Sequence, residues 1–396
     1  MQNKAICNLN FKFLLNISFL LCVTPYKTDQ IDGKVTLTSY PMQKIISAML
    51  TIISMTFSLV HLMVGLISSN LKSAPIGIFY ITSYVSDVLA GAISVGTIWL
   101  KKQSVCDILS IGVNQKPHFV KVILMGVLTS TKILVMTTTI LVMWFVALFE
   151  ACQCTLSPSS RPILTSWLIG MKRVLTGLGY PDFAPNATKS SMEDVSSFEI
   201  TLSVLCMGIL LKFMGFLSGF GSALVLTSSI AMHAEVAKIW TEFDKAKGTV
   251  ILEKYLLVKK SIGKINRVCG PMILSLLLYT ILDVVCIPGQ PTRHFVCVFI
   301  FYTESIVNIT SFLIAAEGHR KCQSIEKRLI GEIGGNSMGY PPFSGYAEIS
   351  TKIRSSPGEN GLQGWQCFTL SYSFLGTVAS VGVTYALVLL QFVSAS

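Results

Sequence analysis

The stretch TYALVLLQF, residues Thr384–Phe392, lies in a long apolar run and constrains the fold of the whole chain. The run covers residues 366–392, which is more than the roughly 20 residues that a membrane-crossing helix needs. It nevertheless keeps a threonine, a tyrosine and a glutamine near its end. Polar groups are costly against lipid, so one side of this helix is expected to face something other than lipid.

The composition of the full chain is that of a polytopic membrane protein. Of the 396 residues, 52% are hydrophobic and only 13% are charged, and the mean hydropathy is +0.63. Soluble domains carry roughly 25% charged residues. The formal net charge of +11 is best explained by lysine and arginine in cytoplasmic loops, so no nucleic-acid partner is expected.

Enzyme chemistry has no support in the sequence. The 11 cysteines and five histidines are scattered, without a paired CxxC or the spacing of a zinc site. The only close cysteine pair is Cys152 and Cys154, whose disulfide status is open. The motifs GxxxxGK[ST] and HExxH are absent, and the one GxSxG match, at residues 335–339, falls in a Gly- and Ser-rich stretch expected to be a flexible loop. We therefore expect no catalytic residues, no metal site and no cofactor.

Seven apolar stretches predict an all-α fold with seven transmembrane helices. They cover residues 43–68, 76–100, 121–149, 198–226, 268–287, 294–317 and 366–392. A division into four regions follows: a cytoplasmic segment with an amphipathic helix (1–42), six spans with a cytoplasmic extension at 227–267 (43–317), a cytoplasmic helix and flexible loop (318–365), and the last helix (366–396).

The distribution of positive charge predicts the orientation. Most of the 31 lysine and arginine residues fall on the side that holds the N-terminus, which places the N-terminus in the cytoplasm and the C-terminus outside. The sequon at Asn186 then lies outside, where glycosylation is possible. A multi-pass plasma-membrane protein is expected. A G-protein-coupled receptor would have the opposite orientation, and a secondary transporter is disfavoured by the lack of an internal repeat.

One face of the last helix is polar. At 100° per residue, the polar side chains fall within an arc of about 60°, with Val388 at its edge; they are Ser373, Thr377, Ser380, Thr384 and Gln391. Small hydroxyl residues could serve helix packing. Alternatively, the stripe lines a water-filled pore. One stripe cannot enclose a pore, so this interpretation requires several copies around an axis.

The motif of the last helix resembles the C-terminal signature of insect gustatory receptors: Thr-Tyr, five apolar residues, then Gln-Phe. The fixed positions are Thr384, Tyr385, Gln391 and Phe392. The preceding FTLSYSFLGTVAS, the stretch KSIGKINRVCGPMILSLLLYTILDV around the fifth span, and the pair Ala315-Ala316 before a charged helix are also similar to that family.

The resemblance implies a ligand-gated cation channel, related to insect odorant receptors and built from four identical or related subunits. In such a channel the last helix lines a central pore whose gate lies at its outer end. Val388, Gln391 and Phe392 would lie at the gate, and Thr384, Ser380 and Thr377 along the conduction path. The cytoplasmic parts of the last four spans would pack into an anchor domain that holds the subunits together.

The ligand implied by the resemblance is a small-molecule tastant bound in the outer half of the first six spans. Sugar receptors of the family carry glutamate where this chain has Ala386, which argues against a general sugar receptor. A receptor for plant deterrents or for a fructose-type sugar remains open. Aromatic and acidic residues in the spans are candidate contacts, because aromatic faces stack on flat ligands and carboxylates bind hydroxyls or amines. They are Tyr80, Tyr84, Asp87, Trp144, Phe145, Tyr279, Asp283, Phe301, Tyr302 and Glu304. The charged members could instead pair with one another across spans, for instance Asp87 with Lys132 or Glu304 with Lys212.

Overall fold

A computed structural model describes residues 16, 19, 24–31, 34–68, 75–113, 212–243, 248–286, 295–335, 351 and 360–395. The predicted third span (121–149), the sequon at Asn186, and the candidate ligand contacts Trp144 and Phe145 lie outside the described residues. So do Lys132, most of the N-terminal amphipathic helix and most of the predicted flexible loop.

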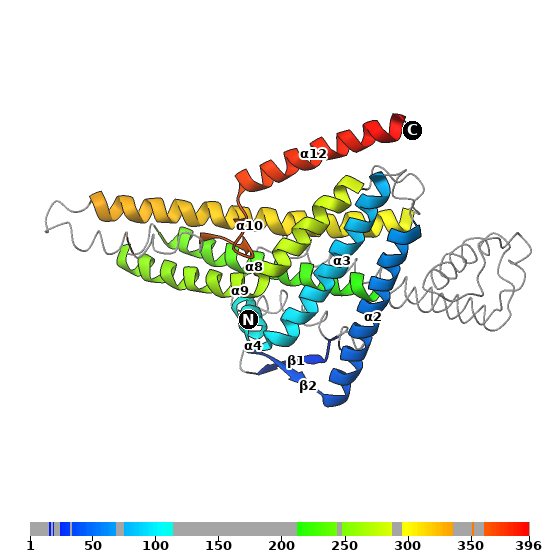
Figure 1. Ribbon diagram of the computed structural model, residues 1–396. Coiled ribbons are helices and arrows are strands. Elements are labelled where there is room, and N and C mark those ends of the chain that lie inside the picture. The colour runs from blue at the N-terminus through cyan, green and yellow to red at the C-terminus, as the bar shows by residue number, and fades with distance from the viewer. Residues whose placement is uncertain are drawn as a thin grey trace, which may run out of the picture.

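The described chain is a bundle of long helices with two small hairpins (Figure 1). The helices are α2 (Pro41–Ser68), α3 (Pro75–Leu100), α4 (Lys102–Val113), α8 (Lys212–Glu242), α9 (Gly248–Cys286), α10 (Phe295–Gly335) and α12 (Tyr372–Ala395). Proline is the first residue of both α2 and α3, where its missing N–H and fixed φ are compatible with helix initiation.

Helices occupy the predicted spans where the structure describes them, with one shift and several extensions. Helices α2 and α3 match the first two spans closely. The fifth and sixth spans are the second half of α9 and the first half of α10, and both helices continue well beyond the expected membrane region. At about 1.5 Å per residue, the 41 residues of α10 extend about 60 Å, twice the hydrocarbon thickness.

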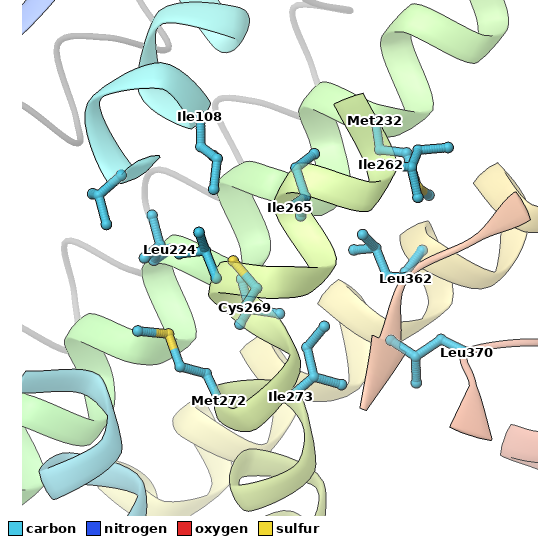
Figure 2. Packing of buried hydrophobic residues seen from close by; sticks show 14 of the residues in the cluster. Ile108, Leu224, Met232, Ile262, Ile265, Cys269, Met272, Ile273, Leu362 and Leu370 are labelled. Carbon is cyan, nitrogen blue, oxygen red and sulfur yellow. The ribbon is translucent and has the colours of Figure 1, made fainter. Parts of the chain in front are cut away.

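The core lies where α3, α8, α9 and α10 pack together. Figure 2 shows its centre, where Leu224 from α8 and Cys269 and Met272 from α9 lie together. Small residues permit the close approach of α3 and α8: a Cβ added at Gly221 would lie 2.1 Å from Ser94 Oγ. Such small-residue interfaces are typical of helices that pack inside a membrane. Ala315 and Ala316 of α10 are fully buried in the same bundle.

Two hairpins were not predicted from the sequence. Strands β1 (Tyr26–Ile31) and β2 (Lys34–Ser39) pair in antiparallel register within the segment expected to contain only an amphipathic helix. They pack against α4, and Lys102 Nζ lies 5.0 Å from the ring centroid of the buried Tyr26. The second hairpin, β3 (Gln363–Gly364) and β4 (Phe368–Thr369), occupies the expected start of the last span. The last helix therefore begins at Tyr372 instead of residue 366.

Candidate functional site

The last helix, α12, has a defined start. The Ser371 hydroxyl accepts a hydrogen bond from the backbone N–H of Phe374 at 3.1 Å, and its carbonyl accepts one from Leu375 at 2.9 Å. This is the geometry of an N-cap, which satisfies donors that the first helical turn leaves open. Phe374 also stacks on Phe368 of β4, with ring centroids 4.3 Å apart. The helix is thus fixed directly to the hairpin that precedes it.

The hairpin turns through two residues with positive φ. Trp365 (φ 47°) and Gln366 (φ 63°) form the turn, which the N–H of Cys367 closes on the carbonyl of Gly364 at 2.9 Å. Left-handed backbone at both central positions defines a type I′ turn, which usually carries Asn or Gly. For other residues this conformation costs roughly 1–2 kcal/mol each, so the surrounding contacts must hold it in place.

Asn266 of α9 provides the central contact to the hairpin. Its Nδ2 donates to the carbonyl of Gly361, and its Oδ1 accepts from the N–H of Gln363, both at 3.0 Å. One turn further along α9, the carbonyl of Gly270 accepts the N–H of Trp365 at 3.1 Å. An added Cβ at Gly270 would lie 3.1 Å from that nitrogen, so a side chain there would crowd the hairpin.

Two buried leucines anchor the same hairpin in the core. Leu362 and Leu370 are fully buried, and the N–H of Leu370 donates to the carbonyl of Leu362 at 2.8 Å. Figure 2 shows both side chains beside Ile273 of α9. Full burial of two leucines stabilises this docking by roughly 3–6 kcal/mol relative to exposure.

The start of the hairpin is held by Asn360. Its Nδ2 donates to Glu326 Oε2 at 2.6 Å, its Oδ1 accepts from the Tyr255 hydroxyl at 3.4 Å, and its backbone carbonyl lies 3.1 Å from His319 Nδ1. Burial raises the pKa of Tyr255, which keeps its hydroxyl a donor. Helices α9 and α10 therefore both hold the segment that leads into α12.

A third contact joins α12 directly to α10. The hydroxyl of Tyr372 donates to Glu317 Oε2 at 3.0 Å, and Arg320 donates to both oxygens of the same carboxylate at 2.8 and 2.7 Å. The bidentate pair orients the carboxylate toward the tyrosine. We call these three residues the base clasp.

We expect Tyr372→Phe to weaken the base clasp without disturbing packing. The variant removes one exposed charge-assisted hydrogen bond, so the free energy of unfolding should fall by about 1 kcal/mol. In detergent this corresponds to a melting temperature lower by about 2–4 °C. Tyr385→Phe, which removes an exposed tyrosine hydroxyl just past the middle of α12, is the matched control. Equal melting temperatures for the two variants would show that the clasp contributes nothing.

Beyond its first turns, α12 stands apart from the other helices that the structure describes (Figure 1). Phe374, Leu375 and Val378 are partly buried against the core, whereas Tyr385 is 56% exposed and Val388 41% exposed. The predicted stripe residues with described side chains are all exposed: Ser373, Thr377, Ser380, Thr384 and Gln391. The side chain of Phe392 lies outside the described part. Among the described residues, the contacts that hold α12 to α9, α10 and the hairpin lie at its base.

The hydroxyls of the stripe present oxygen to their surroundings. Thr377 Oγ1 donates to the carbonyl of Ser373 at 3.0 Å, and Thr384 Oγ1 to that of Ser380 at 2.9 Å. Because each proton is directed back into the helix, the oxygen lone pairs face outward. Exposed oxygens at this spacing can replace part of the hydration shell of a cation.

The predicted ligand contacts divide into three groups. Tyr279 and Asp283 of α9 are buried, and Asp87 of α3 is half-buried. Only the backbone positions are described for another group: Tyr80 and Tyr84 in α3, and Phe301, Tyr302 and Glu304 in α10. Trp144 and Phe145 lie outside the description, so a shared pocket stays a prediction, as do the pairs Asp87–Lys132 and Glu304–Lys212.

A polar seam between α9 and α10 includes one of these candidates. Ser305 Oγ donates to Asp283 Oδ2 and Asn308 Nδ2 donates to Thr280 Oγ1, each at 3.1 Å. All four side chains are buried. A carboxylate at this depth needs such hydrogen bonds. Ser305, Asn308 and Thr280 were not predicted as site residues from the sequence, although Asp283 and Thr280 lie three residues apart on one helix face.

Comparison with known proteins places this arrangement in a known fold. No family model and no curated protein matches the sequence. Among solved structures, an olfactory receptor of the insect Machilis hrabei, OR5 in complex with eugenol, is similar over 96% of this chain and 97% of that chain, with a TM-score of 0.53 and 13% identity. The structure of the same receptor without that compound covers the same shares, with a TM-score of 0.47 and 15% identity. The likeness is one of fold, and it confirms the all-α, seven-transmembrane architecture.

Within the described part of the chain, no group of three or more His, Cys, Asp or Glu residues could hold a metal ion. The features that the described residues do bring together are the hairpin, the base clasp and the exposed polar stripe. The hairpin and the base clasp hold the start of α12, and the stripe is the polar face that α12 presents.

Proposed function

We propose that this chain is a gustatory receptor: a subunit of a ligand-gated, non-selective cation channel of the plasma membrane, opened by a small-molecule tastant. The observation that carries the proposal is the state of α12, which is fixed at its base and bears an exposed polar stripe along its free length. The likeness of fold to an insect olfactory receptor and the TYALVLLQF motif support it independently.

The polar stripe suits a helix face that lines a pore better than one that faces lipid. Four copies of α12 around an axis would place Thr377, Ser380 and Thr384 along a conduction path, with Val388, Gln391 and Phe392 at its outer constriction. Other exposed side chains of α12 are apolar or aromatic and suit contact with lipid or neighbouring helices; among them are Val381, Val383, Tyr385 and Leu387. An oligomer with related receptors would serve equally, since the stripe requires only that each subunit contribute one helix.

The contacts at the base of α12 would transmit the effect of ligand binding to the gate. Movement of α9 or α10 would reach α12 through Asn266, the buried leucines and the base clasp. The neighbour in complex with eugenol supports a small organic ligand here as well. Plant deterrents and sugars are the two tastant classes we propose. The first experiment is calcium entry in cells that express the chain, tested with quinine, caffeine, fructose, sucrose and eugenol.

Orientation separates this proposal from a G-protein-coupled receptor. We expect an epitope added after residue 396 to bind antibody on intact cells, and one added before residue 1 to bind only after permeabilisation, because the lysines and arginines gather on the N-terminal side. Immunofluorescence with and without detergent measures this directly. An N-terminal epitope accessible on intact cells would overturn the channel proposal and favour coupling to G proteins.

A further inference from the structure

Helix α9 has an interior proline at the level where the hairpin docks. Pro271 has no backbone N–H, so the carbonyl of Arg267, four residues earlier, lacks the donor that a regular helix would supply. A helix normally bends at such a position. The two halves of α9 run in different directions in Figure 1.

A lysine from another helix supplies a donor to this carbonyl. Lys101 Nζ donates a hydrogen bond to the carbonyl oxygen of Arg267, across 166 residues of sequence. Lys101 is the residue between α3 and α4, and its own backbone is fixed on both sides. Its N–H donates to the Thr97 carbonyl at 2.8 Å, and its carbonyl accepts from Val105 at 3.0 Å. The backbone that carries the ammonium group is therefore fixed at the end of a packed helix.

The same turn of α9 also carries the hairpin. Asn266 and Gly270 flank Arg267 and make the hydrogen bonds to Gln363 and Trp365 described above. The interrupted turn is thus the place where the end of α3 and the segment leading into α12 both attach to α9. Helix α3 belongs to the bundle expected to bind the ligand, and α12 carries the proposed pore stripe.

We propose that Lys101 is a positioning residue: it replaces the hydrogen bond that Pro271 removes, and so couples the end of α3 to the hairpin at the base of α12. A change in the position of α3 would then alter the turn of α9 that holds the hairpin. This coupling depends only on the hydrogen bonds given above. Its role in opening the channel rests on the proposed function.

Hydrogen exchange of the purified chain tests the coupling without any ligand. We expect Lys101→Met to speed amide exchange in peptides covering residues 264–272 and 360–370 by about fivefold, because the hairpin opens more readily when its support is loosened. Lys101→Arg keeps a donor of similar reach and should restore protection. Lys260→Met removes an equal charge from an exposed position of α9 and serves as the matched control.

The proline provides a second, independent test. Pro271→Ala restores the backbone N–H for the Arg267 carbonyl, so Lys101→Met should have little further effect in that background. In the parent chain, Lys101→Met should lower the melting temperature by about 1–3 °C. An equal drop in both backgrounds, or equal exchange in Lys101→Met and Lys260→Met, would overturn the proposal. If Pro271→Ala does not fold, the comparison of Lys101→Met with Lys101→Arg decides the question.

The functional arm uses whichever of the five tastants above gives the largest current. Lys101→Met should shift its half-activating concentration by about fivefold, with Lys101→Arg close to the parent. If the parent chain passes no current with any of the five, the proposed function fails, whereas the exchange and melting experiments still decide the coupling. An unchanged half-activating concentration in an active channel would exclude a role for Lys101 in opening.

Discussion

A Thr384→Cys variant should become sensitive to a positively charged thiol reagent that cannot cross the membrane. When the reagent is applied from outside together with an activating tastant, the cation current should fall at least about tenfold. Thr384 lies on the exposed stripe, so the reagent would attach a fixed positive charge to each copy of α12 beside the conduction path. A charge there repels permeating cations, and a barrier raised by about 1.4 kcal/mol already reduces the current tenfold.

Ala386→Cys is the matched control, because residue 386 lies about 160° around the helix from residue 384. Its current should change little. The unsubstituted chain is measured as well, since it has cysteines of its own, of which Cys367 is exposed at the opposite end of α12. Equal sensitivity of both variants, or insensitivity of Thr384→Cys, would assign the stripe to helix packing.

Asn266→Leu should destabilise the chain strongly, because it removes two hydrogen bonds at the base of α12. The substitution leaves the Gly361 carbonyl and the Gln363 N–H without their partner at a part-buried position. Two unsatisfied backbone groups cost about 2–4 kcal/mol together. The measurements are the melting temperature in detergent and the amount of protein at the cell surface, which should fall severalfold.

Two further variants sharpen this test. Asn266→Asp keeps the acceptor for the Gln363 N–H but loses the donor to Gly361, so its loss should be intermediate. Ser261→Ala removes an exposed hydrogen bond to Leu257 on the same helix and should change stability by no more than about 0.5 kcal/mol. If Asn266→Leu behaved like Ser261→Ala, the hairpin would be held by its leucines alone.

The helices could be predicted because their signal is local. Residues 43–68 and 76–100 are long, predominantly apolar runs, and α2 and α3 coincide with them almost residue for residue. The stripe on α12 is likewise a periodicity within one helix; its described side chains are exposed, and its facing a pore stays a prediction. In each case the sequence of the segment alone determines the pattern.

The hairpin before α12 has no such local signal. Its strands are two residues each, and the turn uses Trp365 and Gln366 where Asn-Gly would have been recognised. Phe368, Thr369 and Leu370 continue the apolar composition of the following helix, which explains the early start predicted for the last span. What stabilises the hairpin is Asn266, about 95 residues away in sequence.

The candidate site was predictable only in part for the same reason. That Asp283 is buried and hydrogen-bonded follows the general expectation for a carboxylate in a span, but its partner Ser305 could not be chosen among the many serines of the chain. The contact between Lys101 and Arg267 depends on how α3 meets α9. A lysine after an apolar run is otherwise explained by the preference for positive charge on the cytoplasmic side.

The central claim is that several copies of α12 line one pore with the polar stripe facing the axis. An electron cryomicroscopy structure of the purified protein in mild detergent tests it most directly. We predict a particle of four chains in which Thr377, Ser380, Thr384 and Gln391 of each α12 face a common axis, with the hairpins packed around the cytoplasmic end. A particle with one chain, or an assembly in which the stripe faces lipid or the interior of its own bundle, would contradict this account.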